Sequence, residues 1–476
     1  VGAQRLVQHE RVAVRQLAPP SLPRVAETQI EPLLLAVTVV LASLVAFLTN
    51  ILPAMQAARF APADELKEGN KSATSGGGRL RWRQALVTTE IALAVVLVIG
   101  AGLLIRSVVN LLSVDTGFSS ANVLTMRLST PSTWYPDSAR VAAFWSEAER
   151  RVAAVPGVRS VGPARLLPLA TEMGDWGVQV EGYTPPPNQG TPADWQVVTP
   201  GFFGALGLRL REGRFLQAGD DIAGPLAIVV NRQFTERYLA GRPPLGIRVR
   251  IGSRQSPTPY TIVGVVDDVR HNGLTTEVKA QFFVTVAQFA RAPGNTLRSL
   301  SLVIKTEGDP DALVEPVKAV LRELDPRLPI AEVRTLDEIV AGSIAAPRFA
   351  MQLLGVFGVG ALLLSSIGIF GLVSHSVAMR EREFGIRAAL GARPGELIGL
   401  GLAGGLRQTA AGIAIGVVAA LALTRLLGQL LEGVSATDPT TFMAVVLVTG
   451  LVALTASVVP ALRAARAHPA LVLRGD

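Results

Sequence analysis

The sequence predicts an α-helical membrane protein of about five spans, with a large α+β domain inserted between the second and third spans. The 476-residue chain has a mean hydropathy of +0.40, and only 17% of its residues are charged. Both ends of the chain contain uncharged runs about as long as a helix that crosses a bilayer. The middle of the chain, residues 106–347, instead carries turns, polar residues and most of the aromatic residues.

Composition excludes several classes of function. The chain has no cysteine, which rules out disulfides, thiol catalysis and cysteine-based zinc sites. Its net charge of +8 does not indicate nucleic-acid binding, because the basic residues gather at the ends of apolar runs and form no stripe with interleaved aromatic residues. The chain begins at Val1 without a signal-peptide pattern, so we expect an N-terminally truncated fragment.

The first two spans are predicted near the N-terminus. Residues 1–31 are mixed in polarity and broken by prolines, and we expect them on the extracytoplasmic side. A span over 32–52 is followed by a basic linker, 53–84, which Gly76-Gly77-Gly78 should make flexible. The second span covers 85–105 and contains Glu90 near its basic end, close enough to pair with Arg83.

Residues 106–347 read as a soluble α+β domain large enough to bury its own core. Alternating β-like and helical patterns also fit a doubly wound sheet, although no glycine fingerprint supports one. The expected strands are Val123–Leu128, Leu226–Val230, Tyr260–Val266, Phe282–Val286 and Ser301–Lys305, and the expected helices are Ser138–Ala154, Gln233–Leu239 and Pro310–Leu324.

Three further spans are predicted in residues 348–476, over 349–377, 408–427 and 442–459. The second of these contains Gly412-xxx-Gly416. Small residues at this spacing allow helices to approach closely in lipid, but glycine is also simply frequent in membrane helices, and both interpretations stay open.

Charge predicts which side of the membrane each loop occupies. The short segments 53–84 and 379–395 and the C-terminal tail are basic, whereas 426–441 has no Lys or Arg. Because short cytoplasmic loops are enriched in Lys and Arg, the basic segments should be cytoplasmic and the 106–347 domain extracytoplasmic. This arrangement predicts a multi-pass membrane protein. With no cysteine and a bacterial character expected, the membrane would be the bacterial inner membrane and the large domain would lie in the periplasm or extracytoplasmic space.

The segment Met379–Pro394 lies between two apolar runs and is dense in charge. Ile386, Leu390 and Phe384 have helix-compatible spacing, which predicts a short amphipathic helix at the membrane surface. Gly391 should end this helix, and Pro394 should begin the next. A solvated loop that obeys the positive-inside rule is the alternative.

A repeated motif follows two of the apolar runs. Both copies read P-A-x-x-A-A-R-x-x-P, which indicates duplicated halves. The first proline would begin a helix at the membrane surface, the arginine would hold the interface, and the second proline would end the helix. The residues concerned are Pro53, Arg59, Pro62, Pro460, Arg466 and Pro469.

No motif in the chain predicts catalysis. The pair Lys71-Ser72 lacks the spaced first glycine of a P-loop, and no G-x-S-x-G elbow occurs. Neighbouring Asp267 and Asp268 favour a strand-end or turn role over acid–base chemistry, since adjacent strand residues point to opposite faces. The histidines, His9, His271, His375 and His468, are scattered without metal-ligand spacing. Two ionisable residues near membrane depth, Glu90 and Arg407, are better explained as structural anchors than as functional groups, with Arg407 at the interface if 395–406 lies flat.

The Met379–Pro394 segment closely resembles the cytoplasmic coupling segment of FtsX-like, MacB-type ABC transporter permeases. In that family the segment docks onto a separate ATPase subunit. The resemblance implies that the contact is made by Arg380, Glu381, Arg382, Glu383, Phe384, Gly385, Ile386, Arg387, Leu390, Gly391, Ala392 and Pro394.

Further motifs extend this resemblance along the chain. Residues 106–347 resemble a MacB-like periplasmic core domain, and 348–476 resemble an FtsX-like permease domain. Residues 85–476 are similar to one complete permease half and 1–52 to the end of a preceding half, as in duplicated orphan permeases of the family. The motifs are Arg106-Ser107-x-x-Asn110-Leu111, Asp115-Thr116-Gly117-Phe118, Thr199-Pro200-Gly201-Phe202-Phe203 with Gly207, Val263-Gly264-Val265-Val266-Asp267-Asp268-Val269 and Thr437-Asp438-Pro439.

The resemblance implies the membrane subunit of an ABC transporter that couples a separate ATPase to movement of an extracytoplasmic domain, for export or mechanotransmission. The expected partners are the lipid bilayer, the ATPase, the other permease half or a second copy, and a protein outside the membrane. Enzymatic activity, a cofactor and a metal are not expected. An orphan membrane sensor or scaffold is the alternative, and an extracytoplasmic enzyme is disfavoured because no catalytic constellation occurs.

Overall fold

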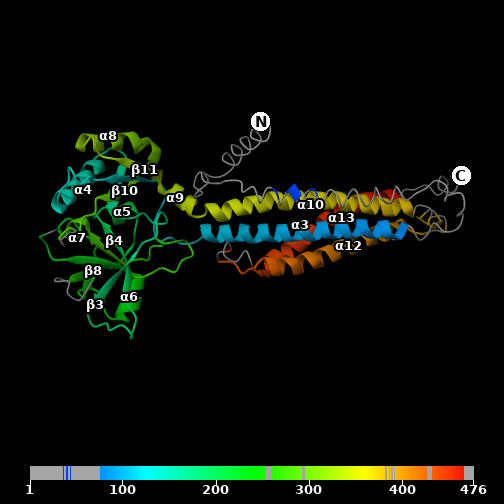
Figure 1. The fold of residues 1–476 in the computed structure, drawn as a ribbon, viewed down its shortest axis with the longest axis horizontal. Helices are drawn as coiled ribbons and strands as arrows, with labels where there is room; N and C mark the ends of the chain where they lie inside the picture. The colour runs from blue at the N-terminus through cyan, green and yellow to red at the C-terminus, as the bar shows by residue number, and fades with distance from the viewer. Residues whose placement is uncertain are drawn as a thin grey trace. The chain divides into compact units, whose positions relative to one another are not determined.

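The computed structural model describes residues 76–465 apart from gaps at 222, 253–258, 292–294, 381–382, 385, 388–389, 391, 426–430 and 432, together with positions 36, 39–40 and 43. The chain divides into two compact units at Leu111 and Ile344. We call residues 111–344 the inserted domain and the remainder the helical unit (Figure 1).

The helical unit contains four long helices that are apolar on all sides. They are α3 (Gly76–Leu112), α10 (Ala345–Met379), α12 (Pro394–Leu423) and α13 (Pro439–Ala465). Each is long and apolar enough to cross a membrane, and no other described helix is. The expected span over 32–52 lies outside the described residues apart from positions 36, 39–40 and 43.

The helices are longer than the predicted spans. Helix α3 begins at Gly76, so the three glycines expected to form a flexible linker are helical. Helix α12 runs without interruption from Pro394, so residues 395–406 do not form a separate flat segment before Arg407. A glycine costs a helix only about 1 kcal/mol relative to alanine. The residues that follow Gly76-Gly77-Gly78 favour a helix strongly enough to include these glycines.

Helix α3 packs closely against α12 at the predicted glycine pair. A Cβ atom on Gly412 would lie 2.7 Å from Ile91 Cβ and 3.0 Å from the Thr88 carbonyl oxygen. A Cβ atom on Gly416 would lie 2.8 Å from the Ala92 carbonyl oxygen. Close packing therefore accounts for these two glycines, in keeping with the small-xxx-small interpretation.

The eleven described strands of the inserted domain form one sheet. Four of them form an antiparallel part with a split βαβ arrangement, which is joined to the other strands through β2–β4. The strand order of this part is β11-β1-β10-β2, and α4 and α8 make the two crossovers. The bounds are β1 (Val123–Ser129), α4 (Ser138–Ala153), β2 (Val158–Ala164), β10 (Ser299–Thr306), α8 (Val314–Leu324) and β11 (Ile330–Thr335).

The remaining strands form a closed ring. The order β4-β3-β7-β8-β6-β9 returns to β4 through a parallel β4–β9 pairing, and β5 adds to β8. Only β4–β9 and β6–β8 are parallel among the pairings of the described strands, so the sheet is not doubly wound. The bounds are β3 (Asp175–Val180), β4 (Pro192–Val198), β5 (Leu210–Gly213), β6 (Ala227–Asn231), β7 (Arg248–Ile251), β8 (Tyr260–Val266) and β9 (Gln281–Thr285).

Short helices fill the connections, and side-chain caps define several of their starts. Asn231 accepts a hydrogen bond from the Phe234 amide at the start of α6, and Thr335 and Glu338 form a capping box on α9. The bounds are α5 (Phe202–Ala205), α6 (Arg232–Leu239), α7 (Val286–Phe289), η2 (Pro310–Leu313) and α9 (Leu336–Ser343).

Large apolar side chains form the core of the inserted domain. The largest fully buried ones include Trp145 of α4 and Tyr238 of α6. At the ends of the domain, Leu111 and Ile344 share a small apolar cluster with Leu274. The domain therefore has its own core, and its first and last residues meet.

Candidate functional site: the turn between α10 and α12

The turn between α10 and α12 is held in place by Phe384. This side chain is 3% exposed and packs against Leu397 in the first turns of α12, with Val377 and Ala392 beside it. The Phe384 amide donates to the Arg380 carbonyl oxygen at 3.0 Å, which continues the helical geometry of α10 into the turn. Pro394 is the first residue of α12, as predicted, because proline is well suited to a first helical turn.

The outer surface of the turn is apolar with a charged edge. Leu390 is 82% exposed and Ile386 is 52% exposed, and Met379 at the end of α10 is also exposed. Glu383 and Arg387 form an ion pair of 2.6 Å one helical turn apart. The turn thus presents two large apolar side chains next to a charge pair. Such a surface is able to bind a partner through apolar burial and to select it by charge.

The structure corrects the predicted amphipathic face. Phe384 points inward to Leu397, whereas Ile386 and Leu390 are exposed, so the three do not share one face. The reason is helical geometry, because positions 384 and 386 are about 200° apart around a helix. Of the remaining candidates, Glu381, Arg382, Gly385 and Gly391 lie outside the described residues, as does the side chain of Pro394.

The repeated proline motif is described only at Pro460. This proline lies inside α13, which continues to Ala465, so it does not begin a helix. A proline within a membrane helix is tolerated where neighbouring groups satisfy the freed carbonyl. The other motif residues, Pro53, Arg59, Pro62, Arg466 and Pro469, lie outside the described residues.

A polar cluster joins the far end of α3 to the start of α13. Arg106 donates to the Asp438 carboxylate and to the Thr440 hydroxyl. The Asp438 carboxylate also accepts from the Thr441 amide at 2.9 Å and the Thr441 hydroxyl at 2.7 Å. These hydrogen bonds, first that of the Thr441 hydroxyl, lower the pKa of Asp438 to about 2. Asn110 extends the contact by donating to the Gly433 carbonyl oxygen at 3.2 Å.

The sequence motifs include the residues on both sides of this cluster, but they do not show that the two sides are in contact. Arg106 and Asn110 belong to one motif and Asp438 to another, more than 320 positions along the chain. Their opposite charges at the same ends of two predicted spans are the signal that would have paired them.

The intramembrane ionisable residues do not form the predicted pair. Among the described residues, no ion pair joins Glu90 to Arg83; Glu90 lies beside Gly368 of α10, where an added Cβ would be 2.9 Å from its Oε2 atom. Arg407 is exposed along α12. Neither residue shows an arrangement that would support chemistry.

The other candidate residues have structural surroundings. Asp267 follows β8 and pairs with Arg209 at 3.0 Å, while Asp268 accepts from the Asn231 side chain and the Gln233 amide at 2.9 Å each. The predicted strand-end role of both aspartates is confirmed. His271 is buried in the inserted domain and His375 is on α10, and the described residues contain no group of three possible metal ligands. His9 and His468 are outside the described residues.

Comparisons with known proteins match both parts of the chain. Residues 85–322, half of the chain, match the MacB-like periplasmic core domain, and residues 355–469 match the FtsX-like permease C-terminal domain. These matches, with the four apolar helices, indicate a membrane protein that has an extracytoplasmic domain.

Similar proteins include transporters from several bacteria. The chain is 23% identical over 202 residues to "Uncharacterized ABC transporter permease YknZ" of Bacillus subtilis, covering 42% of this chain and 49% of that protein. It is 29% identical over 219 residues to "Macrolide export ATP-binding/permease protein MacB" of Chromobacterium violaceum, covering 45% and 33%. The chain therefore spans between about a third and a half of the length of these two relatives.

One solved structure among the matches is the periplasmic region of MacB from Actinobacillus actinomycetemcomitans. It is 17% identical, covers 48% of this chain and 95% of that one, and has a TM-score of 0.32. The two domain matches establish the family by themselves, because together they extend from the second predicted span to the last helix. The chain belongs to the MacB/FtsX-like family of ABC transporter permeases.

Proposed function

We propose that this chain is the membrane subunit of a MacB/FtsX-type ABC transporter that couples a separate ATPase to movement of its extracytoplasmic domain. The observation that carries the proposal is the turn between α10 and α12, which is anchored by Phe384 and exposes Ile386 and Leu390. Two large exposed apolar side chains on a short charged turn suit a protein contact better than contact with water.

The chain has a direct mechanical route from this turn to the other elements. Phe384 joins the end of α10 to the start of α12 through Leu397, so a displacement of the turn would move both helices. Helix α10 leads directly from the inserted domain at Ile344, and the Arg106–Asp438 cluster joins α13 to α3, the other helix that leads to that domain. Packed helices transmit such displacements because close-packed interfaces resist deformation.

The relatives support an ATPase as the partner. Proteins named "ATP-binding/permease" match this chain over only part of their length, and the sequence of this chain contains no P-loop motif. A separate nucleotide-binding partner would supply the ATP hydrolysis that a permease of this family uses. Export and mechanotransmission are both compatible with this role.

The test is capture of candidate ATPases by the full-length protein, comparing wild type with Glu383→Arg plus Arg387→Glu. The exchange keeps an ion pair within the turn but reverses the charges that a partner meets, so ATPase capture should fall by about tenfold or more. A second variant, Leu390→Asp, should reduce capture through the apolar contact, because it places a charge where the partner would bury a leucine.

A matched control exchanges the charges of an ion pair within one helix of the inserted domain. Glu315 and Lys318 of α8 lie 2.8 Å apart, and Glu315→Lys plus Lys318→Glu should leave capture unchanged. Membrane insertion is measured for each variant. Capture that survives both variants of the turn would contradict the proposed contact, and a wild-type protein that captures no ATPase would favour an orphan sensor or scaffold.

A further inference from the structure

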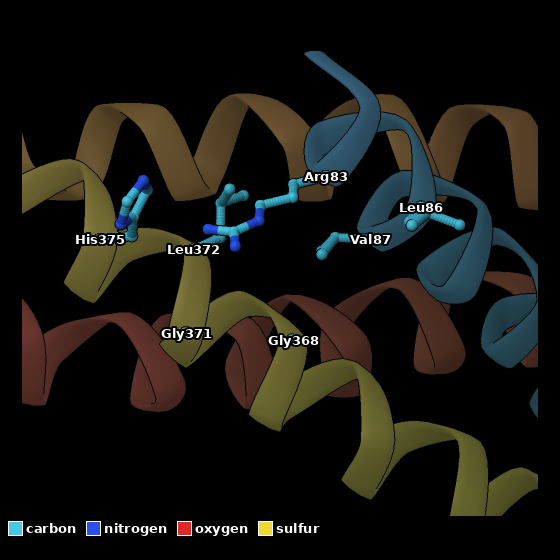
Figure 2. Close-up of a pocket in the computed structure, with 7 residues that line it drawn as sticks. All are labelled: Arg83, Leu86, Val87, Gly368, Gly371, Leu372 and His375. Carbon is cyan, nitrogen blue, oxygen red and sulfur yellow. The ribbon is translucent and has the colours of Figure 1, made fainter. Parts of the chain in front are cut away.

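A groove opens between α3 and α10. It lies near the start of α3 and near the end of α10, the two helix ends that are not connected to the inserted domain. Its volume is about 320 Å³. The walls are formed by Leu86, Val87 and Leu372, and the α10 side of the groove contains Gly368 and Gly371 (Figure 2). Gly371 leaves open space in the groove, because a Cβ atom on it would have no neighbour within 4 Å, whereas Gly368 packs closely against Val87 and Glu90.

Two nitrogen-bearing side chains stand at one end of this apolar groove. Arg83 reaches from the first turns of α3 toward Leu372, and His375 follows one turn later on α10 (Figure 2). An arginine guanidinium donates in a fork that matches a phosphate, and an imidazole donates from one nitrogen in either charge state. The mouth therefore offers hydrogen-bond donors and a permanent positive charge directly above an apolar slot.

The position along the helices places this mouth at a membrane surface. Arg83 is the last basic residue before the apolar run of α3, and His375 is four residues from the end of α10. From there the groove continues along Val87 toward Gly368, into the apolar part of both helices. A headgroup at the mouth and an acyl chain in the slot would each meet matching chemistry.

We propose that this groove binds an anionic phospholipid, with the phosphate held by Arg83 and His375 and an acyl chain lying along Val87 and Gly371. A free anion would use only the mouth and leave the apolar walls in contact with lipid. The inference does not depend on the proposed ATPase contact.

The test uses the full chain in nanodiscs that contain brominated lipid, with quenching of tryptophan fluorescence as the measurement. Trp82 immediately precedes Arg83 in the sequence, and the other four tryptophans are in the inserted domain. Brominated phosphatidylglycerol should quench at about one fifth of the mole fraction that brominated phosphatidylcholine requires, since a basic residue near an anionic surface contributes roughly 1 kcal/mol.

Two variants should remove this preference. Arg83→Gln with His375→Gln removes the guanidinium charge and the imidazole, and Gly371→Leu fills the slot. Their matched controls are Arg393→Gln, an exposed arginine in the turn, and Gly360→Leu, a second α10 glycine with open space beside it. Both controls should retain the fivefold preference.

Four results would overturn the proposal. Equal quenching by the two lipids in the wild type would show that the groove does not select an anionic headgroup. Loss of the preference in Arg393→Gln as well would show a general effect of surface charge. Displacement of the lipid by millimolar inorganic phosphate would identify a free-anion site, and quenching by neither lipid would indicate that a second copy of the chain covers the groove.

Discussion

At the scale of single residues, the inserted domain contains two buried groups with opposite responses to pH. Asp194 on β4 is fully buried and accepts from the Asn272 side chain at 2.8 Å. Burial, followed by a hydrogen bond with Asp175 on the neighbouring strand, raises the pKa of Asp194 to about 7. His271 is also buried, and burial followed by repulsion from Arg165 lowers its pKa to about 3.

These pKa directions predict how each residue affects the free energy of unfolding. The folded state holds the Asp194 proton more tightly than the unfolded state does, so the stability from this residue is present below pH 3.8 and is lost as the pH rises through 7. For His271, stability is present above pH 6.5 and is lost as the pH falls toward 3. The two effects partly offset each other between pH 4 and pH 6.5, and single variants separate them.

Asp194→Asn should stabilise the inserted domain relative to wild type more at pH 8 than at pH 5. Asparagine resembles the protonated acid, and the difference should be on the order of 1–3 kcal/mol because one pKa unit corresponds to about 1.4 kcal/mol. Denaturant unfolding followed by tryptophan fluorescence measures it, with Asp311→Asn at an exposed position as the control. A difference that is the same at both pH values would show that Asp194 is ionised in the fold throughout this range.

His271→Gln should make the free energy of unfolding depend less on pH below pH 6, because glutamine does not take up the proton that the buried imidazole resists. The same denaturant unfolding measures it.

At the scale of elements, local patterns predicted what each segment becomes. Strand β8 has the bounds that were predicted from its apolar run, and the predicted helix over Ser138–Ala154 differs from α4 by one residue. Such segments combine a clear period with a cap, as Asp137 provides for α4 by accepting from the Arg140 amide. Where the apolar periodicity and the capping residue indicate the same helix, tertiary packing seldom changes the bounds of that helix.

Pairings between distant segments were not predictable in the same way. The parallel β4–β9 ladder joins residues nearly 90 positions apart, and the Arg106–Asp438 contact joins residues 332 positions apart. Neither is encoded by a local pattern, because any strand or helix end of suitable polarity would have satisfied the same rule. The packing partner of Phe384 was equally hard to predict, because it is Leu397, a residue of the next helix.

Packing of α3 on α12 gives a prediction for these two elements. Gly416→Ile should destabilise the helical unit, since the new side chain would meet the Ala92 carbonyl oxygen and Val95 of α3. The expected cost is about 1–3 kcal/mol, as for other overpacked sites. Thermal unfolding of the protein in detergent measures it. The control is Gly404→Ile in the same helix, where nothing lies within 4 Å of the added Cβ atom. Equal melting temperatures for the two variants would contradict a close α3–α12 contact.

At the scale of the whole molecule, the chain contains one unit that requires lipid and one that does not. Helices α10, α12 and α13 expose large apolar side chains such as Val356, Val418 and Leu447, as expected for surfaces in contact with acyl chains. The inserted domain instead encloses its apolar residues in its own clusters. Hydropathy alone distinguished the two units in the sequence, because a surface in contact with lipid is apolar whereas a surface in contact with water is largely polar.

The meeting of the first and last residues of the inserted domain predicts that it folds without the helices. Excised residues 111–344 should be monomeric in solution and unfold in one cooperative transition, since Leu111 and Ile344 close the domain against Leu274. Within that fragment, Leu111→Ala with Ile344→Ala should lower stability by about 3 kcal/mol or more, because both side chains are only 3% exposed. Leu112→Ala is the matched control, as Leu112 is 64% exposed and its truncation should cost well under 1 kcal/mol. Chemical unfolding of the three fragments decides the point. If the double variant and the control unfold at the same denaturant concentration, the two ends do not close the domain, and its stability must then come from the strand ring and the split βαβ sheet alone.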